Sequence, residues 1–354
     1  MGMTELSRSI LRTVVVFDTL DTPLTPLEIW RYLVAPTGFA ALSDVSKEER
    51  VAEPCCSFRE VVEALREDPL LRDRVEEQDG YIGLRGRVSE LVAMRHAGAR
   101  FAMNHWRILK KWGKRFRLVP FLRLFSACNF LAIDKVHAES DIDLYLVAEK
   151  GRLWFVRFVM NILALLRGDR ITDDHRAEKL CLSFNATVGE AQHMLPLTLA
   201  PRDPYFTLWT NFVRPVLDRG SFSEFRFVNQ HWVSPSLPHT AMIDSVPGMW
   251  GAPASAWRER VRLGLERVLS GRLGDWAERS AKATQLRHLR AQGRDKNNGT
   301  NVVITDDLLK FHSKDGRAAY REKIERLSGE YGLDTPSSQG APQMDRAYVA
   351  ANAR

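Results

Sequence analysis

Two carboxylates stand two residues apart at the head of an apolar run, in Ser140-Asp141-Ile142-Asp143-Leu144-Tyr145-Leu146-Val147. Side chains alternate between the two faces of a β-strand, so this spacing predicts that Asp141 and Asp143 share one face. Ile142, Leu144 and Leu146 fall on the opposite face, where burial fixes the register of the strand. Two adjacent carboxylates repel each other unless a cation lies between them, and oxygen ligands of this kind suit Mg²⁺. The stretch therefore predicts a strand that carries a metal site, and the alternative interpretation is a pair of solvated acids.

The residues before this run follow a definite order. Residues 121–127 have the pattern of a strand, residues 128–139 supply a turn and a short helix, and the hydrophobic-D-hydrophobic-D run comes next. This order resembles the nucleotidyltransferase superfamily, which has the DNA polymerase β-like fold. The wider layout looks like a bacterial group that places a winged helix before this domain, with later landmarks at residues 151–157, 179–184 and 229–232. The resemblance covers most of residues 1–320 and implies an α/β protein built on a mixed sheet.

The resemblance also implies an activity and a set of site residues. The activity is transfer of a nucleotidyl group from a nucleoside triphosphate (NTP) to an acceptor, with Mg²⁺ or Mn²⁺ as cofactor. Asp141 and Asp143 would hold the metal as catalytic carboxylates. The triphosphate would lie beside the remaining site residues, Cys128, Asn129, Ser140 and Lys179, of which Ser140 supports the end of the strand. The sequence does not name the acceptor, whether a protein, a small molecule or an RNA.

Two departures from the superfamily pattern touch the chemistry. Cys128-Asn129 stands where the superfamily has Gly-Ser, and cysteine keeps phosphates farther from the backbone than glycine does. The third carboxylate, which acts as general base in the superfamily, belongs on the strand predicted over residues 179–187. We expect Cys181, Ser183 and Asn185 to share one face of that strand, and none is acidic. Loss of a general base typically costs about 10²–10⁴-fold in rate. The alternatives are therefore a catalytically degenerate domain that binds nucleotide or nucleic acid as a regulator, and an antitoxin or scaffold component.

Composition limits the protein class. The chain has 354 residues, of which 45% are hydrophobic, enough for two or three domains. The most apolar stretch, residues 153–166, is interrupted by Arg157 and is too short to span a bilayer, so we expect a core-packing helix and no membrane partner. The first nine residues lack the pattern of a secretory signal, which predicts a cytoplasmic protein. The four cysteines lack C-x-x-C spacing and are expected to be reduced thiols without a zinc site.

Positive charge is concentrated in one segment. The net charge is +7, and residues 85–123 hold eight Arg and three Lys against one acid, Glu90. The apolar spacing in this segment predicts one long helix that links the first domain to the second. Its basic face could hold the phosphates of a nucleic-acid acceptor or contact a protein acceptor, and the alternative is a solvated linker helix.

The first hundred residues predict a second unit. Residues 6–17 have helical spacing, and Thr25 and Ser57 each begin a capping box that marks a helix start. Residues 74–84 read as two short strands around the tight turn Asp79-Gly80. Three helices and a hairpin predict a winged helix. Its helix over residues 57–67 carries more acids than bases, which favours packing or partner binding over sequence-specific DNA recognition.

The remainder is expected to be mostly structural. The aromatic stretches at residues 203–206 and 222–233 are interpreted as core, with a nucleobase pocket as the alternative, and His231 as a structural histidine. Residues 254–289 predict a helical subdomain with a core of Trp257, Val261, Leu265, Val268, Leu273 and Trp276. Helix is predicted again over residues 306–327. The predicted division is a winged-helix domain (1–86), a basic linker helix (87–118), a nucleotidyltransferase-like domain (119–250), a helical extension (251–327) and a disordered tail (328–354).

Overall fold

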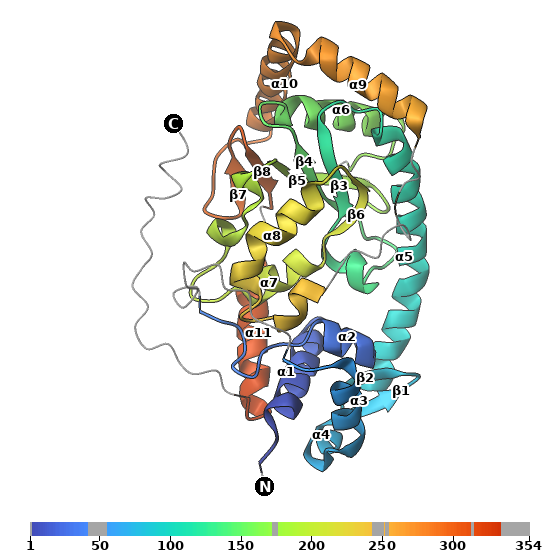
Figure 1. Cartoon of the computed structure of the whole chain (residues 1–354), viewed down its shortest axis with the longest axis vertical. Helices are drawn as coiled ribbons and strands as arrows, with labels where there is room; N and C mark the ends of the chain where they lie inside the picture. The colour runs from blue at the N-terminus through green and yellow to red at the C-terminus, as the bar shows by residue number, and fades with distance from the viewer. Residues whose placement is uncertain are drawn as a thin grey trace.

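The chain has a mixed α/β architecture (Figure 1). The computed structural model describes residues 2–41, 55–171, 176–242, 251, 255–312 and 315–333. These residues form eleven α-helices, a six-stranded mixed sheet and a two-stranded hairpin. The predicted α/β class is therefore confirmed. Among the described residues, no helix combines the length and the apolar character needed to cross a bilayer.

The N-terminal part consists of short helices and the predicted hairpin. The capping boxes are confirmed, because the Thr25 hydroxyl accepts the Glu28 backbone N–H and the Glu28 carboxylate accepts the Thr25 N–H. At the hairpin turn both Asp79 and Gly80 have positive φ, which suits the right-handed twist of the paired strands. Leu24, which lies between the first two helices, forms an antiparallel β-bridge with Ile82 of the hairpin. These elements are α1 (Glu5–Thr19), α2 (Pro26–Arg31), α3 (Phe58–Glu67), α4 (Pro69–Arg74), β1 (Val75–Gln78) and β2 (Tyr81–Leu84).

One long helix connects this part to the sheet. Helix α5 (Val88–Phe116) has 29 residues, about 43 Å at the usual rise, and runs from the hairpin along the side of the sheet (Figure 1). Its Gly98 lies directly against the loop that follows β3, because a Cβ atom here would clash with the backbone carbonyl of Asp134. The long helix predicted from the apolar spacing is thus confirmed, and it passes close to the segment that leads into β4.

The main sheet has the strand order β6-β3-β4-β5-β8-β7. Strands β4 and β5 are parallel and are joined by α6 (Leu153–Leu166), whereas the other neighbouring pairs are antiparallel. The strands are β3 (Leu122–Ala127), β4 (Ile142–Ala148), β5 (Leu180–Thr187), β6 (Arg214–Asp218), β7 (Val302–Ile304) and β8 (Leu308–Phe311).

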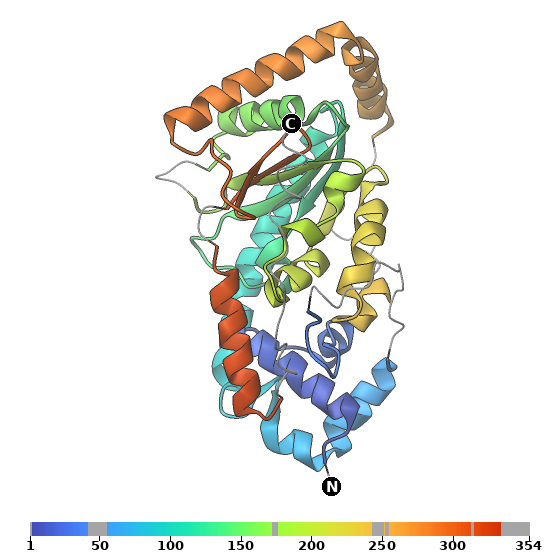
Figure 2. The same cartoon turned by 90° about the vertical axis from the view of Figure 1, so that its left-hand side faces the viewer.

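Helices bury both faces of the sheet, and β4 contributes to both cores. Ile142, Leu144 and Leu146 pack with α5, α6 and α10 (Arg272–Ala291), whereas Tyr145 and Val147 face the other core. That second core contains α7 (Pro204–Asn211), α8 (Ser221–Val233), the N-terminal helices and α11 (Arg317–Glu330). In Figure 2, α6 in green and the yellow α8 lie on opposite sides of the sheet. The predicted alternation of β4 and the core-packing role of α6 are confirmed. Short 3₁₀ segments complete this region, η3 (Glu190–Gln192) and η4 (Leu195–Leu197).

The predicted core of the C-terminal helices is wrong. The side chains predicted to form it lie on the outer surface of α9 (Ala256–Leu269) and α10, with Trp257 57% and Trp276 62% exposed. The opposite, charged side of α9 faces the sheet domain instead. Glu259 pairs there with Arg219, and Glu266 pairs with Arg123. Ion pairs that are largely shielded from water therefore attach this helix. The residues of the predicted core that are exposed instead are Trp257, Val261, Leu265, Val268, Leu273 and Trp276.

The predictions for the C-terminal end also need correction. Residues 308–311 form strand β8 rather than helix, because they pair with β5 and extend the sheet. Helix begins only at Arg317, whose side chain is buried and bonds Asp203 at 2.9 Å. The tail was predicted from residue 328, yet α11 continues to Glu330 and Leu333 is buried. Residues 334–354 lie outside the described part of the chain.

Candidate functional site

The structure brings the two predicted carboxylates together at the start of β4. Asp141 immediately precedes the strand and Asp143 is its second residue. Their oxygens and the sulfur of Cys181 all lie within 4.8 Å of one another. Asp141 is 22% exposed, so the pair is accessible from one side. Three potential metal ligands therefore converge at this edge of the sheet.

The turn after β3 fixes the orientation of Asp143. The Asn129 amide donates a hydrogen bond to Asp143 Oδ2 at 2.8 Å, and the Tyr205 hydroxyl donates to Asn129 Oδ1. Asn129 begins the 3₁₀ segment η2 (Asn129–Ile133) with φ of 64°, a conformation that asparagine tolerates better than most residues. The N–H of Cys128 donates to the Asp143 carbonyl at 3.1 Å and continues the ladder between β3 and β4. The turn thus holds one carboxylate in a defined position.

The two carboxylates create a negative site with little compensation. Burial, and next the charge of Asp141, raise the pKa of Asp143 to about 6. The Arg176 guanidinium lies 3.3 Å from Asp141 Oδ2, but its side chain is 66% exposed and is weakly restrained. A divalent cation between the carboxylates would relieve their repulsion, and their oxygens fit Mg²⁺ or Mn²⁺.

Cys181 occupies the position on β5 that faces Asp143. The parallel register pairs Asp143 with Cys181, and the thiol donates to Ser183 Oγ at 3.2 Å. Burial, followed by the two aspartates, raises the pKa of the Cys181 thiol. It therefore stays protonated at neutral pH and does not act as a general base. The residue that faces Asp143 from β5 is therefore a cysteine and not a third carboxylate.

The prediction that Asn185 shares the face of Cys181 is wrong. The register pairs Asp143 with Cys181 but Tyr145 with Phe184, so β5 holds one extra residue at this point. As a result, Leu182 and Phe184 pack into opposite cores, and Asn185 turns away from the carboxylates. Its side-chain amide instead donates to the Leu182 carbonyl at 3.1 Å.

The other predicted residues surround the pair in different ways. The Ser140 hydroxyl accepts the His137 N–H at 3.0 Å, and its carbonyl accepts the Glu178 N–H at 2.9 Å, so it braces the loop before β4. The Cys128 thiol is buried in the core, and this burial raises its pKa. Lys179 lies beside the strand start, where its carbonyl accepts the Ile142 N–H at 2.8 Å. Its contact with phosphate stays a prediction.

Sequence analysis missed three neighbours of the site. Arg176 contacts Asp141, Tyr205 holds Asn129, and Asn104 of α5 donates to Glu178 at 2.6 Å. The residues before β5 could have been found, because parallel strands bring the segments before β4 and β5 to the same edge. Tyr205 and Asn104 reach the site through tertiary packing, which leaves no local pattern.

Helix α5 presents two kinds of cation. Several are tied into the structure, such as the N-cap residue Arg87 with Asp18 and Arg95 with Glu28, both at 2.5 Å. The exposed ones fall within an arc of about 100° and form a stripe about 21 Å long, which we call the α5 basic stripe. The stripe adjoins Asn104 and hence the loop beside the carboxylates. Its members are Arg100, Arg107, Lys110, Lys111 and Lys114.

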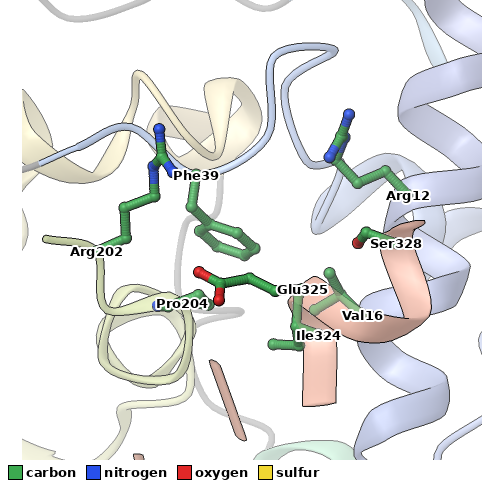
Figure 3. Close-up of a pocket in the computed structure, with 8 residues that line it drawn as sticks. All are labelled: Arg12, Val16, Phe39, Arg202, Pro204, Ile324, Glu325 and Ser328. Carbon is green, nitrogen blue, oxygen red and sulfur yellow. The ribbon is translucent and has the colours of Figure 1, made fainter. Parts of the chain in front are cut away.

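A small pocket lies away from the carboxylates (Figure 3). It is lined by side chains of α1 and α11 together with Phe39, Arg202 and Pro204. Its volume of about 20 Å³ suits a single water molecule rather than a nucleotide. The pocket is therefore a packing gap between helices and not a second ligand site.

Comparisons of the chain with protein-family models, curated proteins and solved structures found no match. A relationship to the nucleotidyltransferase superfamily therefore rests on the paired aspartates and on the order of elements around them.

Proposed function

We propose that the chain is a metal-dependent nucleotidyltransferase that moves a nucleotidyl group from an NTP to an acceptor. The observation that carries this proposal is the convergence of Asp141 and Asp143 at the start of β4, beside the turn from β3. The antiparallel β3–β4 pair and the parallel β4–β5 pair support a nucleotidyltransferase-like domain. The N-terminal helices, the Leu24–Ile82 pairing and the hairpin support a winged helix before it.

The residues at the site would divide the work as follows. Asp141 and Asp143 would hold Mg²⁺ or Mn²⁺, which neutralises the triphosphate and polarises the reacting phosphate. Asn129 keeps Asp143 in position through its amide. Arg176 can leave the Asp141 carboxylate, because it is exposed, and bind a phosphate oxygen instead.

Transfer forms a bond from the acceptor oxygen to the α-phosphorus and breaks the bond to the departing pyrophosphate. The acceptor proton must also be removed. Cys181 holds its own proton at neutral pH, so this proton would pass to solvent or to the substrate. We therefore expect slow transfer compared with a site that has a general base.

A second candidate function is nucleotide binding without transfer, as a sensor or regulator. Cys181 at the register position opposite Asp143 favours it, because two carboxylates suffice to bind a metal–nucleotide complex. The two candidates share the same metal–nucleotide site and differ only in chemistry.

The α5 basic stripe supports a polyanionic acceptor. Its five cations lie on one solvent-facing arc of the helix, beside the loop that carries Glu178. A nucleic-acid strand bound there would lie near the carboxylates, and its affinity would fall steeply with salt. In contrast, the groove of about 510 Å³ between α3 and the hairpin mixes bases such as Arg66 with acids such as Glu76. That mixture favours a protein partner over DNA.

Incubation with α-labelled NTPs tests the proposed transfer. Purified protein is mixed with each NTP, Mg²⁺ or Mn²⁺ and a mixed RNA, beside the Asp141→Ala/Asp143→Ala variant. Label on protein or RNA that depends on the aspartates is the expected result. Binding of metal–nucleotide without label would favour the second candidate, and absence of both would refute the site.

A Cys181→Asp variant sharpens this assay, because it places a third carboxylate opposite Asp143. If proton removal limits the rate, this variant should transfer about 10²–10⁴-fold faster than the natural chain. Cys181→Ser is the matched control, and it should leave the rate close to that of the natural chain. Equal rates for the Asp and Ser variants would contradict the role assigned to this position.

A further inference from the structure

A second group of potential metal ligands lies far along the chain from the carboxylates. Cys55 and Cys56 precede α3, and His239 belongs to η5 (Pro238–Met242), which follows α8. The His239 Nε2 atom lies 3.7 Å from Cys55 Sγ and 4.0 Å from Cys56 Sγ. All three ligand atoms lie within 4.8 Å of one another. The fold thus joins residues 184 positions apart into one thiol–imidazole cluster.

These separations match a tetrahedral zinc site. Zn–S bonds of about 2.3 Å and Zn–N bonds of about 2.0 Å at the tetrahedral angle place sulfur and nitrogen about 3.5 Å apart. The observed sulfur–nitrogen distances exceed that value by only a few tenths of an ångström. Binding would therefore need only a small movement of the side chains.

The surroundings of His239 already orient its ring for a metal. The side chain is 1% exposed, and Nδ1 lies 2.6 Å from the backbone carbonyl of Trp30. A carbonyl only accepts, so the proton of the neutral ring belongs on Nδ1, and Nε2 presents its lone pair to the thiols. Histidine ligands of metals usually donate their other ring N–H to a carbonyl or carboxylate in this way. The Trp30 indole also donates to the Cys56 carbonyl at 3.1 Å and so holds the cysteine backbone in place.

The chemistry of the thiols agrees with this geometry. Cys55 is exposed and Cys56 is partly exposed, so both thiols can release a proton to solvent when a metal binds. A metal ion would displace those protons and bind both sulfurs. Thiolate and imidazole ligands suit Zn²⁺ and do not suit Mg²⁺, so this site differs from the carboxylate site in metal preference.

We propose that Cys55, Cys56 and His239 form a Zn²⁺ site that fastens the segment before α3 to η5. Cys55 is exposed, so a water molecule or an external ligand can reach the fourth coordination position. The cysteines lack C-x-x-C spacing, so the sequence predicts no zinc site. The cluster escapes that prediction because its histidine comes from a distant part of the chain and leaves no local pattern. The proposal is independent of the nucleotidyltransferase proposal.

Titration with Co²⁺, which substitutes for Zn²⁺ and is coloured, tests this site. The full-length protein is reduced, treated with chelator and titrated with Co²⁺ while the thiolate-to-cobalt absorption band is recorded. We expect a saturable band at one equivalent of metal, which one equivalent of Zn²⁺ abolishes. The Cys55→Ser/Cys56→Ser variant should lose the band.

The matched control is the Asp141→Ala/Asp143→Ala variant, which should keep the full band because its changes lie at the other cluster. The single Cys55→Ser variant alters only an exposed side chain and should weaken the band at least tenfold in affinity while its circular dichroism stays unchanged. A natural chain without the band, or a band that survives in Cys55→Ser/Cys56→Ser, would overturn the proposal.

Discussion

Replacement of Asp143 by asparagine should stabilise the metal-free protein at neutral pH. The folded state holds this carboxylate in a partly buried position beside Asp141, which raises its pKa from 3.8 to about 6. The unfolded chain ionises it more easily, so its charge opposes folding once the pH exceeds about 4. A difference of about 2 pKa units corresponds to roughly 3 kcal/mol at pH 7 and to roughly 1 kcal/mol at pH 4.5. Asparagine can still accept the hydrogen bond from Asn129 without carrying the charge.

Urea denaturation of chelator-treated protein at several pH values measures this effect. The Asp143→Asn variant should gain between about 1 and 3 kcal/mol at pH 7, and the gain should shrink as the pH falls from 6 to 4. Glu139→Gln is the matched control, because it removes an exposed acid from the loop just before β4 and should change little. A destabilised Asp143→Asn variant at pH 7, or a gain that does not vary with pH, would refute the description of the site as two poorly compensated carboxylates.

Three further predictions concern stability, each measured by chemical denaturation. Arg317→Met should lower the free energy of unfolding by about 3–5 kcal/mol, because it leaves Asp203 buried and unpaired. Arg326→Met removes an exposed ion pair and should lower it by less than about 1 kcal/mol. Similar losses in the two variants would contradict this account. Burial lowers the pKa of Lys310 from 10.5 to about 7, so the unfolded chain binds this proton more strongly than the folded chain does. The free energy of unfolding should therefore rise between about pH 7 and pH 10. Lys310→Met should remove that rise, and a rise that persists in the variant would contradict the role given to Lys310. Asn129→Ala should lower the free energy of unfolding by about 1–3 kcal/mol more than Asn129→Gly does, because glycine tolerates the positive φ of this residue. Equal losses in the two variants would show that the backbone is not strained there.

Local features of the structure were readable from the sequence. The capping boxes at Thr25 and Ser57 depend on residues three positions apart, and the hairpin turn depends on Asp79 and Gly80 alone. Because side chains alternate along a strand, Asp143 and Ile142 lie on opposite faces of β4 whichever strands pair with it. Such features follow from short-range geometry, which every window of sequence contains.

The predictions that were wrong or missing concern long-range packing. The spacing of Trp257 and Val261 shows that they share a face of α9, but not that the sheet domain covers the opposite, charged face. The extra residue in β5 that turns Asn185 away becomes visible only when the strand is paired with β4. His239 joins Cys55 through the packing of η5 against the N-terminal part, which no local pattern encodes. Site residues supplied by distant segments were therefore the ones that the sequence concealed.

The central claim is that Asp141 and Asp143 hold a metal–nucleotide complex, and a thermal-shift titration tests it most directly. The melting temperature is recorded with Mg²⁺ alone, NTP alone and both together, for the natural chain and for Asp141→Ala/Asp143→Ala, each relative to its own ligand-free value. We predict that the natural chain is stabilised only by the combination, by about 2.7 kcal/mol at a hundredfold excess over Kd, and that the variant is not. A shift of the same size in the variant would contradict the claim.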